Sequence, residues 1–305
     1  MTDVVTPTGT GAASAPEPAG LPPMQAPSAN NGLLAVFQRR YLLKLLVRRE
    51  ISARYQGSFL GLMWSYVNPL SQFAIYYFIV GEIFQLHEDI PNFALHMFSA
   101  IVIVHFFTET FNAGTRSIVR NRQIVQKMSM PREMFPVASM LVSLYHVGPQ
   151  LVILFIACLL NGWVPELEGV AALVLGLALI MVLGTALALL FSAANVFFRD
   201  VQSFVNILTN LVRFGVPMIY SYQMVDERFG GLADYYLLNP IANAVLMFQR
   251  AFWIGTAPDP AELARTDLPD HLLTRGLAML GVSLVLLVIG QLVFSRLEKK
   301  IPERL

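Results

Sequence analysis

Apolar residues in this chain come in long uninterrupted blocks rather than in alternating runs. Five stretches contain no Asp, Glu, Lys or Arg: residues 56–81, 90–108, 134–165, 169–198 and 276–295. One more stretch, residues 201–225, is the fifth of the six in chain order and is interrupted only by Arg213. Because about 20 helical residues cross the hydrocarbon core of a bilayer, the pattern predicts an all-α integral membrane fold with six transmembrane helices. A shorter block, residues 235–249, contains Pro240 and predicts a re-entrant or interfacial helix on the outer side.

Charged residues alternate in sign between the segments that join these blocks. Lys and Arg gather before the first block, between the second and third, after the fourth and after the sixth. The other connecting segments are rich in Asp and Glu. Since short cytoplasmic loops carry an excess of Lys and Arg, we expect both termini in the cytoplasm.

Composition and missing motifs narrow the class of protein further. The chain has 305 residues, of which only 13% are charged, against about 25% in ordinary soluble domains. It has no GxxxxGK[ST] phosphate loop, so it cannot hydrolyse ATP by that route, and it has no HExxH and no GxSxG. We single out two charged residues in or beside the apolar blocks: Arg213 within block 201–225, and Glu109 directly after block 90–108. Both a structural ion pair and a transport role are open for them.

The segment before the first block divides into two parts. Residues 1–32 are rich in Pro, Ala, Gly, Ser and Thr, which predicts a disordered tail. Residues 33–56 are compatible with a cytoplasmic helix, and residues 57–305 form the six-span domain. Lys44 and Arg48 fall close to the helical face of Phe37 and Tyr41, so we expect a bent or two-part element. Its cations either anchor the chain to anionic lipid or form a docking surface for another protein.

The basic segment between the second and third blocks predicts a short cytoplasmic helix. Arg116, Arg120 and Lys127 would share one helical face, and Pro131 would end the helix. Such a helix can transmit force from a soluble partner, or it can lie on lipid headgroups.

Four motifs in order resemble one known family. They are RREISARYQGSFLGLMWSYVNPL at residues 48–70, NRQIVQKMSMPREMFPVA at 121–138, NVFFRDV at 195–201 and LLNP at 237–240. The chain is similar over about residues 33–305 to the membrane, or permease, subunit of type 2 ABC exporters of cell-surface polysaccharide, such as O-antigen, capsule, teichoic acid and galactan exporters.

The resemblance implies a permease subunit in the bacterial inner membrane that is not itself an enzyme. It implies a homodimer with two copies of a separate ATPase, which would bind ATP and Mg²⁺, so that this chain holds no cofactor or metal. The substrate would be a lipid-linked polysaccharide, membrane lipids would surround the chain, and no nucleic acid is implied. Export of a drug or lipid is an alternative, and a self-contained secondary carrier or a membrane enzyme is a more distant one.

The resemblance also assigns roles to individual residues. Coupling to the ATPase would involve Arg48, Arg49, Glu50, Arg54, Tyr55, Arg116, Arg120, Arg122, Lys127, Arg132 and Glu133. Sugar rings stack on aromatic side chains, so a glycan pathway would be lined by Tyr66, Phe73, Tyr76, Tyr77, Phe204, Tyr220 and Tyr222. Asn239 and Pro240 would belong to an outer gate. Arg199 and Asp200 would form a structural junction, paired locally between the fourth and fifth spans.

Overall fold

Helices make up all of the regular secondary structure in the residues that the computed structural model describes, which are 32–85, 90–128 and 130–304. Four helices are long and apolar enough to cross a membrane. They are α4 (Phe93–Arg120), α6 (Met134–Leu160), α7 (Leu167–Phe197) and α13 (Leu272–Glu298). They coincide with four of the six predicted spans, so the all-α fold is confirmed and four predicted spans have a matching helix. The predicted tail lies outside the described residues, apart from Gly32.

The helix expected over residues 56–81 begins later than predicted. A single-turn helix, η1 (Gly61–Met63), leads into α3 (Trp64–Tyr76), which continues as the π-helical segment η2 (Tyr77–Ile83). Gly57 and Gly61 both have positive φ, +76° and +51°. Glycine adopts this left-handed conformation readily, and two such residues interrupt any helix that would join the preceding segment to α3.

The helix expected over residues 201–225 ends early. Helix α8 (Val201–Val212) has only 12 residues, and irregular backbone follows before α9 (Tyr222–Phe229). Pro217 lies in that irregular stretch, where it has no N–H to donate to a helix. The prediction of one continuous helix here is wrong, because the apolar pattern did not take this proline into account.

The shorter apolar block forms a helix inside the bundle. Asn239 caps α11 (Pro240–Phe248), its side-chain oxygen accepting the Ile241 N–H at 2.9 Å, and Pro240 occupies the first turn. The π-helical η4 (Gln249–Trp253) continues α11. Nearly every side chain of these two elements is buried against α4, α7 and α13. Residues 235–249 therefore include a helix too short to cross a bilayer, packed within the protein.

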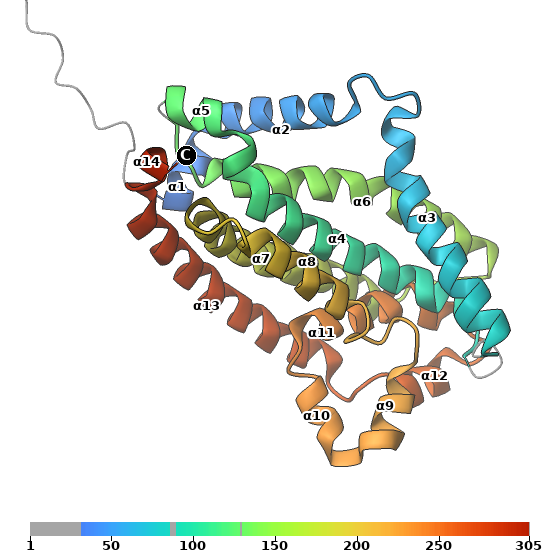
Figure 1. Ribbon diagram of the computed structural model, residues 1–305. Helices are drawn as coiled ribbons and strands as arrows, with labels where there is room; N and C mark the ends of the chain where they lie inside the picture. Colours follow the sequence, from blue (N-terminus) through green and yellow to red (C-terminus); the bar gives the residue numbers. More distant parts are fainter. Residues whose placement is uncertain (1–31, 86–89, 129, 305) are drawn as a thin grey trace, which may run out of the picture.

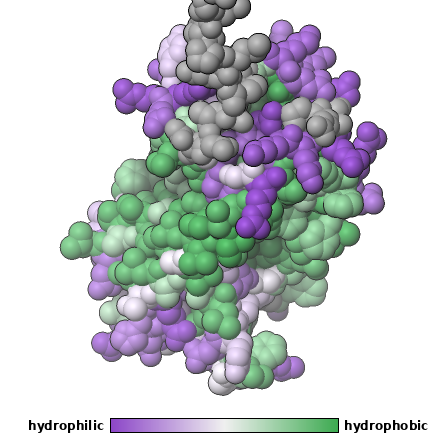
Figure 2. Space-filling model, turned by 90° about the vertical axis from the view of Figure 1, so that its left-hand side faces the viewer, coloured by the Kyte–Doolittle hydropathy of each residue, from purple (hydrophilic) through white to green (hydrophobic). Residues whose placement is uncertain are grey.

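The remaining short elements gather at the two ends of the bundle (Figure 1). One end carries α1 (Gly32–Gln38), α2 (Arg40–Tyr55), α5 (Arg122–Lys127) and α14 (Ile301–Arg304). The opposite end carries α9, η3 (Gly230–Leu232), α10 (Ala233–Tyr236), η5 (Ile254–Thr256) and α12 (Pro260–Asp267). Figure 2 shows an apolar belt between two polar ends, as a bilayer would require. The fold thus separates the basic segments from the acidic ones along the long axis of the helices.

A separate hydrophobic cluster holds the basic end together. Val36, Leu46, Ile118, Val125 and Phe294 are all buried in it. They come from α1, α2, α4, α5 and α13, so the cluster attaches the surface helices to the long ones. This attachment fixes α2 against the long helices.

Candidate functional site

The segment before α3 is a two-part element, as its mixed helical wheel predicts. The backbone at Arg39, with φ −99° and ψ 38°, separates α1 from α2. Leu43 and Leu46 of α2 are buried, whereas Tyr41 is 70% exposed and Leu45 46% exposed. Helix α2 therefore has one apolar side in the protein and another that the chain leaves uncovered.

Asn121 joins α2 to the end of α4. Its side-chain oxygen accepts a hydrogen bond from Arg49 at 3.0 Å, and its side-chain nitrogen donates to Glu50 at 3.0 Å and to the Ser117 carbonyl at 3.0 Å. Arg120 lies 3.6 Å from the Glu50 carboxylate. The two basic segments that the resemblance assigns to ATPase coupling are therefore in direct contact.

The same residue ends α4 and corrects one prediction. Arg116 and Arg120 lie on the last turns of α4, whereas Lys127 lies on α5, which begins after Asn121. The three cations do not share one face of a single helix. The backbone of Asn121, with φ −100° and ψ 22°, breaks the helix there, and its side chain bonds back to the Ser117 carbonyl. Arg122 and Lys127 are exposed on α5.

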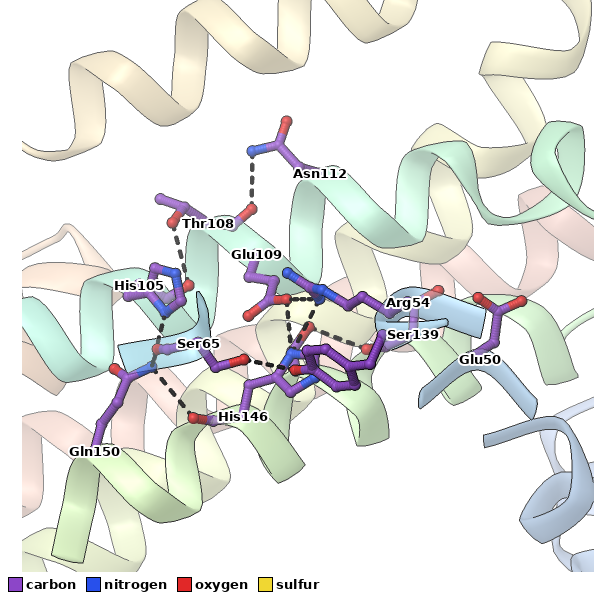
Figure 3. A network of polar contacts seen from close by, with 12 residues as sticks. Glu50, Arg54, Ser65, His105, Thr108, Glu109, Asn112, Ser139, His146 and Gln150 are labelled. Carbon is purple, nitrogen blue, oxygen red and sulfur yellow. Dashed lines mark hydrogen bonds and ion pairs between the residues drawn. The ribbon is translucent and has the colours of Figure 1, made fainter. Parts of the chain in front are cut away.

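A buried polar network lies where the last turn of α2 meets α4 and α6 (Figure 3). Arg54 forms an ion pair with Glu109. The Nδ1 atom of His146 lies 3.0 Å from the Glu109 carboxylate and 3.0 Å from the Arg54 guanidinium. An imidazole nitrogen either donates or accepts a hydrogen bond. Nδ1 therefore donates to Glu109 when it carries the proton, and accepts from Arg54 when it does not. The side chain of Glu109 is 9% exposed and that of His146 is fully buried.

The network extends to α3 through Gln150 of α6. Its side-chain nitrogen lies 3.2 Å from the Ser65 carbonyl, 3.3 Å from His105 Nδ1 and 3.2 Å from the His146 carbonyl. The Tyr55 hydroxyl contacts the Ser65 hydroxyl at 2.6 Å. Polar contacts thus connect α2, α3, α4 and α6. Buried polar groups that lose such partners cost free energy, so a movement of α2 has to rearrange several helices together.

The sequence singled out Glu109 and, separately, Arg54 as a coupling candidate, but it did not pair them, and it did not single out His146. Arg213, the other candidate for a structural ion pair, lies at the end of α8 and forms none within the described residues. Nothing in the sequence around His105 and His146 indicates their partners, because these lie on other helices. An ionisable residue near the end of an apolar helix was the one available signal.

The family described as ABC-2 type transporter matches residues 41–253, which run from α2 to the end of η4 and include the whole polar network. The chain belongs to this family. It is therefore a membrane-embedded transporter subunit.

Relatives of this ABC-2 chain carry a more specific name. The chain is 28% identical to an O-antigen export system permease protein RfbA of Klebsiella pneumoniae over 216 residues, which are 70% of this chain and 81% of the relative. It is 28% identical to a protein of the same name from Myxococcus xanthus over 269 residues, 88% of this chain and 96% of the relative.

Two further coupling candidates of the ABC-2 chain face its C-terminal helix. Arg132 contacts the carboxylate of Glu298 at 3.9 Å and also its backbone carbonyl. Glu133 is buried and accepts a hydrogen bond from Gln291 at 3.0 Å. These two residues tie the start of α6 to the end of α13 and are less available to a partner than the cations of α2 and α5.

The candidate lining aromatics lie mainly on α3 and α8, which both pack on α4. Phe73 contacts Phe98 with ring centroids 5.4 Å apart, while Phe204 is 52% exposed and stacks on Phe191 at 6.3 Å. Partly buried positions are occupied by Tyr66, Tyr76 and Tyr77. The Tyr220 hydroxyl donates to the Phe214 carbonyl at 2.9 Å, and Tyr222 is buried.

The junction between α7 and α8 differs from the expected local ion pair. Arg199 and Asp200 are both exposed, and their side chains form no ion pair with each other. Phe198 has an extended backbone, with φ −132°, and its N–H bonds to the Ala194 carbonyl. Backbone geometry therefore makes this turn without help from the two charges.

Proposed function

We propose that this chain is the permease subunit of an ATP-driven exporter that moves a lipid-linked polysaccharide across the bacterial inner membrane. Membership of the ABC-2 family and the names of its relatives carry the proposal. The working unit is a homodimer of this chain with two copies of a separate ABC ATPase, which binds ATP and Mg²⁺. The chain crosses the membrane six times, with shorter helices at the first and fifth spans, and both termini are cytoplasmic.

The cytoplasmic side is the end that carries α2 and α5. The exposed cations of this end and the acidic loops of the other agree with the positive-inside rule. The ATPase docks on α1, α2 and α5. Uncovered apolar side chains beside cations support this, since Phe37 and Tyr41 are 71% and 70% exposed and Arg48 is exposed on α2 as well.

Force from the ATPase passes into the membrane helices through two contacts. Asn121 connects α2 to the end of α4, and the Arg54–Glu109 ion pair connects the last turn of α2 to the middle of the bundle. The glycan pathway runs beside α3 and α8, where the aromatic candidates lie, and the α11 cap at Asn239 and Pro240 belongs to its outer gate.

The docking proposal is tested by charge reversal. Arg48→Glu and Arg120→Glu are expected to lower ATPase activity of the co-purified complex at least fivefold, because they place carboxylates on the docking surface and beside Glu50. Arg265→Glu on α12 is the matched control, since it reverses an exposed cation at the opposite end. If both variants keep full assembly and ATPase coupling, the docking surface lies elsewhere.

The substrate is tested in cells. Depletion of the chain is expected to accumulate lipid-linked glycan inside and to remove the surface polysaccharide. Normal surface glycan after depletion would instead indicate export of a drug or a lipid. Ion-driven transport by the chain reconstituted alone would indicate a self-contained carrier.

A further inference from the structure

A polar cavity of about 500 Å³ opens at the basic end of the bundle, between α2, α4 and α7. Its charged and amide side chains are Arg54, Glu109, Asn112, Arg116, Arg120 and Asn195. Three guanidinium groups face one carboxylate, so the lining carries a net charge of +2. Such a lining selects for anions.

The guanidinium groups keep donors available. Arg116 bonds through its Nε only to the Asn112 carbonyl, at 3.3 Å, and forms no ion pair within the described residues. The side chain of Arg120 is 58% exposed and its acidic neighbour Glu50 lies 3.6 Å away. The forked guanidinium matches two oxygens of a phosphate group.

The amides of the cavity are already committed to the protein. Asn112 donates to the Thr108 carbonyl at 2.9 Å and to Thr209 at 3.1 Å, and Asn195 donates to the Thr115 carbonyl at 3.2 Å. They hold α4, α7 and α8 together and form rigid walls. Recognition of a ligand therefore falls to the arginines and to Glu109.

Glu109 adds an acceptor beside the cations. Its Oε1 is engaged by Arg54 and His146, whereas its buried Oε2 has no hydrogen-bond partner in the described part of the chain. A buried oxygen without a partner costs free energy. A hydroxyl group of a ligand bound in this cavity would satisfy it.

We propose that this cavity binds the phosphate or diphosphate group of a glycan-bearing lipid, with the adjoining sugar hydroxyls near Glu109. The inference rests on the proposed function and names the part of the substrate that the cytoplasmic end recognises. Arg54 belongs both to the cavity and to α2. An anion that attracts Arg54 weakens its pair with Glu109, so occupancy of the cavity is communicated to the docking helix.

Binding to the full-length chain in detergent tests the site directly. Titration calorimetry with farnesyl diphosphate is expected to show binding, and farnesol, which has no phosphate, to show none. Arg116→Gln combined with Arg120→Gln should weaken binding at least tenfold. Arg122→Gln combined with Lys127→Gln, which removes the same charge from α5 outside the cavity, should change it less than twofold.

Inorganic pyrophosphate separates the two sources of the anion. Binding at least tenfold weaker than that of farnesyl diphosphate assigns the site to a lipid headgroup, and equal binding assigns it to the phosphate group alone. Glu109→Gln removes the negative charge from the lining and should tighten binding at least threefold. The proposal is overturned if farnesyl diphosphate does not bind, if both double variants lose binding equally, or if Glu109→Gln weakens it.

Failure of this site and failure of the proposed function give different results. A chain that exports glycan normally in cells but binds no prenyl diphosphate retains its function and loses the site. A chain that binds prenyl diphosphate while its depletion leaves surface glycan intact retains the site and loses the assigned substrate.

Discussion

At the residue scale, Arg54 has the most consequential position in the chain. Its side chain is 43% exposed, yet it forms an ion pair with a carboxylate that is 9% exposed. An ion pair between two exposed side chains contributes little to the free energy of folding. Breaking a pair whose carboxylate is buried costs more, because it leaves a buried charge without a partner. Helix α2 is therefore held to α4 by a contact that a neighbouring anion can compete for.

The buried carboxyl of Asp267, at the opposite end of the bundle, should make the stability of the protein depend on pH. It is buried at the end of α12, and burial raises the pKa of its carboxyl above the ordinary value, despite hydrogen bonds with Ser221 and Thr266. The folded state then holds its proton more tightly than the unfolded state. Stability from this group is present at low pH and falls as pH rises from the ordinary pKa of 3.8 through the raised one.

Asp267→Asn should remove that loss. We expect its thermal midpoint to exceed that of the unsubstituted chain at pH 8, with the difference shrinking toward pH 4, measured by a thermal melt in detergent. Asp270→Asn, which removes an exposed carboxylate nearby, is the matched control. A difference that is constant with pH would show that burial of the charge is not the cause.

At the element scale, α4 and α7 approach closely because glycine lies at their contact. A Cβ atom built on Gly114 would lie 2.3 Å from the Ala188 Cβ and 3.2 Å from its Cα. Small residues allow such approach between membrane helices, where packing rather than water drives association. Gly114→Ala should destabilise the chain by about 1–3 kcal/mol, the usual cost of overpacking.

Gly281 of α13 is the matched control, because nothing lies within 4 Å of a Cβ built there. Gly281→Ala should leave stability unchanged or raise it slightly, since alanine favours a helix over glycine by about 1 kcal/mol. Thermal melts of the two variants give the comparison. Equal midpoints would mean that α4 and α7 can separate without cost.

The elements themselves were predictable to different degrees. Long charge-free blocks identified α4, α6, α7 and α13, because the bilayer imposes a length and a composition that one sequence reveals. The ends of α3 and α8 were predicted poorly, since charge alone does not register glycines and prolines inside an apolar block. The partners of Glu109 could not be predicted, because Arg54 and His146 are 55 and 37 residues away in sequence. Such contacts depend on how helices pack.

At the scale of the whole molecule, the two ends of the bundle differ in chemistry. The end with α2 and α5 exposes more cations than the other end, where two arginines pair with acidic neighbours. Arg250 contacts Glu166 at 2.6 Å and Glu168 at 3.0 Å, and Arg275 contacts Asp234 at 2.9 Å. Local pairing neutralises part of the charge at that end, whereas Arg48, Arg122 and Lys127 stay exposed at the α2 end.

The orientation proposed for this molecule can be measured with introduced cysteines. The sequence has a single cysteine, Cys158, which is buried, so Cys158→Ala provides a background without thiols. Gln123→Cys places a thiol on α5 and Ala261→Cys places one on α12, both at exposed positions. In spheroplasts, a membrane-impermeant maleimide should label position 261 at once and position 123 only after lysis.

Both cysteines must be labelled in lysed membranes. Only then does a lack of labelling in spheroplasts show that a position is on the inner side. Labelling of position 123 before lysis, with 261 protected, would place α2 and α5 outside. An outside α2 could not reach a cytoplasmic ATPase, so that single outcome would remove the docking surface, the coupling contacts of Asn121 and the inner entry of the cavity together. Labelling in the expected order keeps all three on the side where ATP is available.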